Sequence, residues 1–320
     1  MTSCRSAVVA LALASATLPA GAQRAARIAG VAPVIDSAAT WRTLTQLAAD
    51  SMEGRRLGTR GSATARALLV ERLTRAGLVP LAPGYVQRFP VSLRDTAVHE
   101  GANVIAMVRG TDTARVLVVS AHYDHLGVSG GVVYNGADDN ASGTAVVLAL
   151  AEWYAKHAPR HSMIFAFFDG EELGMPGARS FVRSPPVPRA RIAADVNLDM
   201  VSRLDKNELY AAGASHFPFF RPLLEAAAAV APVKLLLGHD TDAQGAHDNW
   251  TNQSDHWAFH TEGIPWICFG VEDHPDYHRP TDDVDKVSPA RFIGAARTIA
   301  DVLHRLDASL DDIVPVRAAR

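Results

Sequence analysis

Residues 162–172 read Ser-Met-Ile-Phe-Ala-Phe-Phe-Asp-Gly-Glu-Glu, so that an unbroken apolar run meets a group of acids. An apolar strand of this kind is typical of a sheet that is covered on both faces. The acids begin where the chain leaves the predicted core. We therefore expect Asp169, Glu171 and Glu172 at the carboxyl end of a buried strand.

Similar apolar runs, each long enough for a strand, recur at 103–108, 115–121, 192–198 and 264–270. Segments with a helical pattern lie between and around them: two helices between 36 and 77, the second ending at Gly77, then 142–157 and 217–230. Strands that alternate with helices predict an α/β fold. We expect a three-layer sandwich in which helices cover both faces of a mostly parallel central sheet.

Length and composition favour one globular catalytic domain. The chain has 320 residues, and it has no internal repeat that would divide it. With 48% hydrophobic and 20% charged residues, it does not resemble a disordered chain, a coiled coil or a multi-span membrane protein. We predict a single domain at 23–320.

The first 22 residues have the pattern of a secretory signal. Arg5 precedes an apolar run at 7–18, and small residues follow at 19–22. An uncleaved anchor or an amphipathic first helix is the alternative, but the run is short for a membrane span and has no amphipathic stripe. We therefore expect a signal peptide at 1–22 and a secreted or periplasmic protein without a membrane anchor after cleavage.

Charge and cysteine content argue against nucleic-acid binding and against an intrachain disulfide. The formal net charge is -3, and loss of Arg5 with the signal makes it -4, so we expect no nucleic-acid partner. The cysteines are Cys4 and Cys268, and cleavage removes the first. No intrachain disulfide would then form, which leaves core packing and metal binding to stabilise the fold.

Acidic and imidazole side chains directly follow three of the predicted strands: His122, then Glu171 and Glu172, then Asp199. In open α/β sheets, ligands bind at the carboxyl ends of the strands. Any one of these residues is explained as well by a helix cap or a turn. Caps have no reason to fall on the same end of several strands, so the sequence predicts a binding site at this edge.

Two fragments suit metal binding. His122 and Asp124 are two residues apart and face the same side, so the carboxylate is placed to orient the ring of a metal-bound histidine. This spacing alone is weak, since many surface pairs share it. A turn at 136–143 holds Asp138 and Asp139 just before a helix. One residue there is expected to cap the helix, and Asp138 is suited to bridge two ions with one oxygen on each.

The adjacent acids Glu171 and Glu172 are expected to divide two tasks. Neighbouring residues outside a helix point in different directions. One carboxylate therefore suits a metal ion, while the other suits the water that a metal-assisted hydrolase activates. The alternative is an acidic first helical turn, which the helix dipole favours.

These residues belong to five fragments, at 121–124, 135–140, 169–172, 197–200 and 276–279. In residue type and order the fragments resemble the secreted co-catalytic zinc aminopeptidases, metallopeptidase family twenty-eight, which have the zinc-exopeptidase fold. The resemblance covers about 103–287, most of the chain.

The resemblance implies two zinc ions and a ligand for each position: Asp138 as the bridge, His122 and Asp199 in one site, Glu172 and His278 in the other. It also implies that Glu171 is the general base, that Asp124 supports the first histidine, and that Tyr277 donates to the developing oxyanion. A cis peptide bond between Asp138 and Asp139 is implied as well.

The segment 238–260 is dense in His and Asp. A third metal site is one interpretation. A polar loop beside the mouth of the active site explains the composition without a ligand.

The predicted activity is that of a dizinc aminopeptidase, which uses metal-activated water on peptide or protein N-termini. Carboxypeptidase or dipeptidase activity shares the metal core and differs only in pocket residues. Glutaminyl cyclisation belongs to single-zinc relatives, and the doublet Asp138–Asp139 argues against it. A non-catalytic peptide-binding relative would have lost ligands or Glu171, and neither is lost. We expect a monomer.

Overall fold

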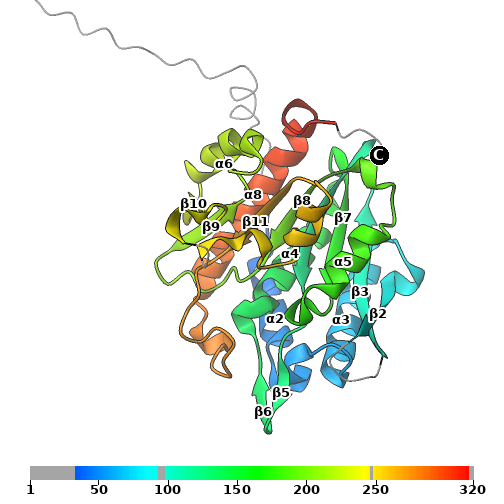
Figure 1. The fold of residues 1–320 in the computed structure, drawn as a ribbon, viewed down its shortest axis with the longest axis vertical. Helices are drawn as coiled ribbons and strands as arrows, with labels where there is room; N and C mark the ends of the chain where they lie inside the picture. Colours follow the sequence, from blue (N-terminus) through cyan, green and yellow to red (C-terminus); the bar gives the residue numbers. More distant parts are fainter. Residues whose placement is uncertain (1–32, 93–97, 246–247, 317–320) are drawn as a thin grey trace, which may run out of the picture.

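A computed structural model of the chain describes residues 33–92, 98–245 and 248–316 (Figure 1). The predicted signal segment lies outside these residues. The main sheet consists of β1 (Val79–Pro80), β2 (Val86–Ser92), β3 (Val98–Val108), β4 (Asp112–His122), β7 (His161–Phe168), β8 (Ile192–Leu198), β9 (Glu208–Ala212), β10 (Lys234–Leu237) and β11 (Trp266–Gly270). A separate hairpin, β5 (Gly127–Ser129) and β6 (Val132–Tyr134), projects at the bottom of Figure 1.

The strand order is β1-β3-β7-β4-β8-β11-β9-β10, with β2 paired to β3. Strands β7, β4, β8 and β11 pair in parallel and form the centre of the sheet. Antiparallel pairs join β3 to β7 and β9 to β11. The predicted α/β fold is confirmed, with the parallel strands at the centre of a mixed sheet.

Helices cover both faces of this sheet (Figure 1). One face holds α2 (Ser37–Leu47), α3 (Arg60–Ala76), α4 (Gly143–Tyr154), α6 (Arg221–Ala228) and α8 (Pro289–Ile313). The other face holds α5 (Pro176–Arg183) and α7 (His256–Thr261). The arrangement confirms the predicted layers.

Burial on both faces explains the apolar run 163–168 of strand β7. Phe165 and Phe167 belong to the core on the α4 side, whereas Ile164 and Phe168 belong to the core on the α5 side. Successive side chains of a strand point to opposite faces, and here each face meets a helical layer. The strand is therefore buried along its whole length.

The helical pattern and the end signals in the sequence were sufficient to predict α2 and α3. Asp36 caps α2 by accepting a hydrogen bond from the Ala39 amide, and Gly77 ends α3 in the left-handed conformation with φ 78°. Strands β9 and β10 and the 25-residue helix α8 were not predicted. The buried residues Phe292, Ile299 and Leu306 of α8 recur at helical spacing, so this helix had a readable signal.

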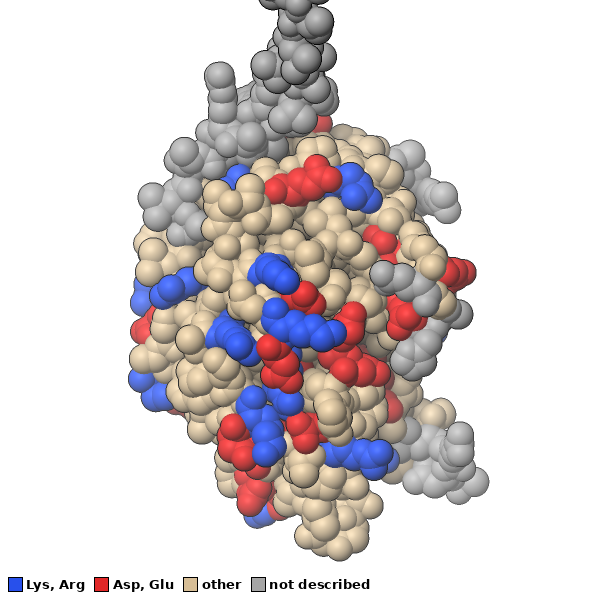
Figure 2. Space-filling model, turned by 90° about the vertical axis from the view of Figure 1, so that its left-hand side faces the viewer, with Lys and Arg blue, Asp and Glu red and all other residues tan. Residues whose placement is uncertain are grey.

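The face shown in Figure 2 has basic and acidic side chains interspersed with uncharged ones. Such mixing gives that face no single sign of charge. The absence of a nucleic-acid partner stays a prediction.

Candidate metal centre

The parallel strands bring distant fragments to one edge. Strand β4 lies between β7 and β8, and its last residue, His122, is in register with Phe168 at the end of β7. On its other side, Ser120 is in register with Asn197 of β8. The residues that follow β7 and β8 therefore emerge beside His122, as the sequence predicted.

One group of possible metal ligands forms around His122. The ring Nε2 lies 3.1 Å from Oδ1 of Asp199 and 3.4 Å from Oδ1 of Asp139. His122 and Asp139 are buried, at 1% and 3% exposure. Burial lowers the pKa of His122, but Asp199 and Asp124 outweigh it and raise the pKa well above its usual value.

A second group forms around His278. Its Nε2 lies 3.1 Å from Oδ2 of Asp139 and 3.1 Å from Oε2 of Glu172. Two donors bound to one tetrahedral zinc ion at about 2.0–2.1 Å lie roughly 3.3 Å apart. The measured separations are close to that value. Asp139 and Glu172 also form a close group of three possible ligands with His125, so the donors around Asp139 fit metal binding.

Asp139 takes the position that the sequence analysis gave to Asp138. Oδ1 of Asp138 accepts hydrogen bonds from the Ser202 amide at 2.7 Å, the Ser202 hydroxyl at 2.7 Å and the Arg203 amide at 3.2 Å. Its Oδ2 lies 3.2 Å from Nε2 of His274. Asp138 therefore fastens two loops behind the site, and the prediction that it bridges the ions is corrected.

The backbone of this turn differs from the expectation by the same one residue. The cis peptide bond joins Asp139 to Asn140, not Asp138 to Asp139. The N-cap position of α4 is Ser142, whose side chain makes no capping hydrogen bond, and Oδ1 of Asn140 accepts a hydrogen bond from the Gly143 amide at 2.9 Å. Two adjacent acids in a turn have the same composition in either register, so their spacing could not decide between them.

Glu171 and Glu172 point to different groups, as expected of adjacent acids. Burial raises the pKa of Glu171 well above its usual range, although His122 opposes the shift. Burial alone would raise the pKa of Glu172 too. Hydrogen bonds with His125 and His278 outweigh this effect and hold the pKa of this carboxylate well below its usual range. Glu172 is thus held as a carboxylate, while Glu171 lines the adjoining cavity.

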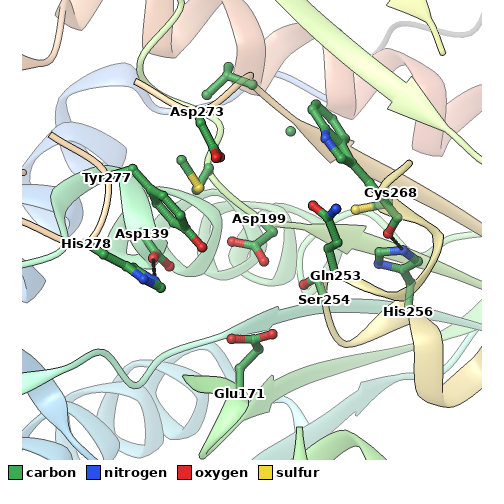
Figure 3. A pocket seen from close by; sticks show the side chains of 14 residues that line it. Asp139, Glu171, Asp199, Gln253, Ser254, His256, Cys268, Asp273, Tyr277 and His278 are labelled. Carbon is green, nitrogen blue, oxygen red and sulfur yellow. Dashed lines mark hydrogen bonds and ion pairs between the residues drawn. The ribbon is translucent and has the colours of Figure 1, made fainter. Parts of the chain in front are cut away.

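Asp124 and Tyr277 lie beside the same groups. Oδ1 of Asp124 is 3.6 Å from Nδ1 of His122 and accepts a hydrogen bond from the Glu171 amide at 3.0 Å. The Nδ1 atom is closer to the Asp124 carbonyl, at 3.2 Å. Tyr277 stacks on His278 with ring centroids 3.9 Å apart, and Figure 3 shows its hydroxyl directed into the cavity.

Two residues of the site were missed by the sequence analysis. Nδ1 of His125 lies 2.6 Å from Oε1 of Glu172, the oxygen that does not face His278. A further histidine directly after Asp124 was visible in the sequence, but nothing there indicated its partner. This contact orients Glu172 in the way that carboxylates orient metal-bound histidines.

The other missed residue is Arg55, which is fully buried. Its guanidinium donates to the carbonyls of Tyr123 at 2.8 Å, Leu47 at 2.6 Å, Asn135 at 2.6 Å and Gly136 at 3.0 Å. Burial lowers the pKa of Arg55 to about 10. The side chain joins the loop that follows His122 to the turn that carries Asp139. No sequence pattern predicts this role for an arginine.

A cavity lies beside the two groups (Figure 3). Its lining consists of Asp139, Glu171, Asp199, Met200, Trp250, Gln253, Ser254, His256, Cys268, Gly270, Val271, Asp273, Tyr277 and His278. Four of these are acids, and none is Lys or Arg. The cavity therefore suits a substrate with a cationic end.

Several polar groups in the described part of segment 238–260 make contacts within the protein, whereas the carboxyl oxygens of the buried Asp255 have no hydrogen-bond partner among the described residues. Asp240 accepts hydrogen bonds from the Gly213 and Ser215 amides, and His239 stacks on Trp250 with ring centroids 3.9 Å apart. Within the described part of this segment, no group of three His, Cys, Asp or Glu residues is placed to hold an ion. The structure favours the polar-loop interpretation there.

Comparison with known proteins adds a family and relatives. A sequence model described as Peptidase family M28 matches residues 103–303. A probable zinc metalloprotease of Pyrenophora teres f. teres is 30% identical over 215 residues, 63% of this chain and 44% of that protein. A vacuolar membrane protease of Schizophyllum commune is 34% identical over 145 residues, 45% of this chain and 14% of that protein. The chain thus matches less than half of the length of either relative.

Solved structures share the fold. A zinc aminopeptidase from Bacillus subtilis aligns with a TM-score of 0.70 at 17% identity, covering 85% of this chain and 95% of the other. A glutaminyl cyclase from Porphyromonas gingivalis aligns with a TM-score of 0.69 at 20% identity, covering 85% and 99%. At these identities the likeness concerns the fold alone.

The relatives correct the expected location. We predicted a secreted or periplasmic protein, but relatives from Schizophyllum commune, Candida albicans and Clavispora lusitaniae are named vacuolar membrane proteases, after a membrane inside the cell. Those names overturn the prediction. Within the described part of the chain, no helix has both the length and the apolar character that a bilayer crossing requires.

Proposed function

Because the chain belongs to peptidase family M28, we propose that it is an aminopeptidase that uses two zinc ions to release N-terminal residues from peptides. The observation that carries the proposal is the position of Asp139. Its Oδ1 faces His122 at 3.4 Å and its Oδ2 faces His278 at 3.1 Å. One carboxylate with an oxygen directed into each group of donors is what a bridged pair of ions requires.

The ligand set follows from these contacts. Asp139 would be shared, His122 and Asp199 would hold one ion, and Glu172 and His278 would hold the other. Mixed imidazole and carboxylate donors suit zinc, although cobalt and manganese accept them too. When bound, the ions supply the Lewis acidity that makes water a nucleophile near neutral pH.

The remaining chemistry belongs to side chains that line the cavity. Glu171 takes the proton of the attacking water and returns it to the departing amine. The Tyr277 hydroxyl donates a hydrogen bond to the carbonyl oxygen as that atom gains negative charge. Asp124 positions Glu171 by accepting the hydrogen bond of its amide.

The charge of the cavity favours an amino over a carboxyl end. A carboxypeptidase needs a cationic group for the terminal carboxylate of its substrate, and arginine is the residue best shaped for it. The described lining contains neither Lys nor Arg, whereas Asp273 adds a fourth acid. A free α-ammonium group therefore fits this lining better than a carboxylate does.

Two measurements test the proposal. Elemental analysis of protein purified without added metal should give two zinc ions per chain. The zinc-loaded protein should release p-nitroaniline from leucyl-p-nitroanilide and leave the N-acetylated substrate intact. Cleavage of an N-blocked peptide with a free carboxyl end would indicate a carboxypeptidase. One zinc ion per chain with cyclisation of N-terminal glutamine would indicate a cyclase. Two zinc ions without turnover would indicate a binding protein.

A further inference from the structure

One carboxylate in the cavity has no place in the metal centre. Asp273 follows β11 and lines the cavity together with Val271 and Tyr277. It has no hydrogen bond or ion pair with residues in 33–92, 98–245 and 248–316. Figure 3 shows the Asp273 side chain across Asp199 from Glu171, with its carboxyl group directed into the cavity.

The neighbouring acid is directed elsewhere. Glu272 lies 3.8 Å from Nζ of Lys206 and 3.6 Å from Nε2 of His239, and it does not line this cavity. Of two adjacent acids after β11, only Asp273 offers an unpaired charge to a substrate. Glu272 therefore serves as a matched control for the charge of this loop.

The other acids of the cavity already have a proposed task. Asp139 and Asp199 are assigned to the ions, and Glu171 is assigned as the base. Asp273 is the acid of this lining without such a task, and the described lining has no Lys or Arg. A cationic group that enters the cavity would meet this carboxylate.

The wall beside Asp273 suits an aliphatic stem. Met200, Trp250 and Val271 line the cavity, and Gly270 is the last residue of β11. A Cβ atom at Gly270 would lie 2.9 Å from the Asp199 carbonyl and 3.2 Å from the Trp250 ring, so a larger residue there would displace this wall. Lysine and arginine carry an apolar stem with a charged end, which matches a wall that ends at a carboxylate.

We propose that Asp273 selects peptides whose N-terminal residue is lysine or arginine. The apolar wall holds the methylene stem, and the Asp273 carboxylate pairs with the ammonium or guanidinium group. This inference rests on the proposed aminopeptidase activity, because it concerns the side chain of the residue that is released.

Lysyl- and norleucyl-p-nitroanilide are the matched substrates, since their side chains share a four-carbon stem and differ in the ammonium group. The wild-type protein, loaded with zinc, should cleave the lysyl substrate with the higher kcat/KM. Asp273→Asn should lower the lysyl-to-norleucyl ratio of kcat/KM by about five- to ten-fold, as expected of a partly exposed charged pair. Glu272→Gln should leave the ratio within about two-fold, because its charge acts outside the cavity.

The outcomes separate the two proposals. If neither anilide is cleaved, the aminopeptidase proposal fails, and the specificity falls with it. If the norleucyl substrate is cleaved at least as well as the lysyl one, or if Asp273→Asn leaves their ratio unchanged, only the role of Asp273 is wrong. An equal loss on both substrates in Asp273→Asn would place the carboxylate on the α-ammonium group instead, and it would also overturn the inference.

Discussion

The two ends of strand β7 lie beside similar side chains in different electrostatic surroundings. Near its carboxyl end, ligand atoms of His122, Asp139 and Asp199 lie within 4.8 Å of one another. At its amino end, an equally close group contains His161 and Asp311, with Asp112. Both groups have the residue types of a metal site, and only one of them is proposed as such.

The amino-end group contains its own cations. Asp311 pairs with Arg160 at 2.5 Å and with Arg115 at 3.5 Å. Both ring nitrogens of His161 are engaged, Nδ1 at 3.1 Å from Asp307 and Nε2 at 3.1 Å from Asp311. The charge of Asp311 is therefore compensated by arginines within the group, and the group does not need a metal ion for that purpose.

The carboxyl-end group has no such compensation. Within the described residues, Asp139, Glu172 and Asp199 form ion pairs with histidines and with neither Lys nor Arg. The nearby guanidinium of Arg55 donates to carbonyls instead. Buried carboxylates need a cation. The comparison teaches that placement of arginine, more than the number of His and Asp residues, separates a closed ion-pair group from a site that requires metal.

Replacement of the shared ligand should give the largest effect. In Asp139→Asn, both ions lose a charged donor, so kcat/KM for leucyl-p-nitroanilide should fall by about 1,000-fold or more, since Lewis-acid stabilisation is worth several kcal/mol. Zinc content, measured by elemental analysis, should fall below two per chain.

Asp138→Asn is the control for that change. It alters the adjacent acid, whose partners are Ser202, Arg203 and His274. The variant should keep two zinc ions, with a smaller loss of activity from displaced loops. Two ions in Asp139→Asn, and fewer in Asp138→Asn, would restore the bridging role that the sequence analysis gave to Asp138.

These two residues also mark the limit of sequence reasoning for this site. Apolar strands that end at His122, Phe168 and Leu198 were enough to predict the sheet and the edge where the site lies, because the pattern of a buried strand is local. The direction of each acid after a strand depends on contacts with remote loops. The Ser202 and Arg203 amides, which donate hydrogen bonds to Asp138, lie more than sixty positions away from it in the sequence.

The same reason explains why Arg55 and His125 were missed. Arg55 lies outside the segment that matches the family model, 103–303, and its partners are carbonyl groups, which every residue has. His125 directly follows the fragment 121–124, but its partner Glu172 is 47 positions away. Contacts of this kind follow from the tertiary fold and leave no periodic trace in the sequence.

Removal of the buried guanidinium should give the next largest effect. Arg55→Met leaves four carbonyls without their donor, so the free energy of unfolding should fall by about 3 kcal/mol or more, as judged by the cost of buried unsatisfied groups. Arg160→Met removes an arginine of the amino-end group that is 45% exposed, and should cost less than about 1 kcal/mol. Urea denaturation measures both, and equal losses would contradict the contrast between the two ends.

Glu171→Gln tests catalysis apart from metal binding. The substitution keeps the shape of the side chain and removes its capacity to accept a proton. We expect kcat to fall by about 100-fold or more, which is about 2.7 kcal/mol. Zinc content should stay at two per chain. Activity near the wild-type level would refute the assignment of Glu171 as the base, and loss of zinc would make it a ligand.

The smallest effect belongs to the amino end and depends on pH. Burial lowers the pKa of His161, but hydrogen bonds with Asp307 and Asp311 outweigh it and raise the pKa above 6.5. A histidine whose pKa is raised by folding stabilises the fold fully below its unfolded pKa, and this contribution is lost as the pH rises through the folded pKa. The loss of unfolding free energy in His161→Gln should therefore be larger at about pH 6 than at a pH above the raised folded pKa, where the histidine is neutral in both states. In an Asp311→Asn background, which removes one partner, the difference between the two pH values should shrink. A cost that is the same at both pH values would mean that His161 acts through packing, and the amino-end group would then not be a closed set of ion pairs.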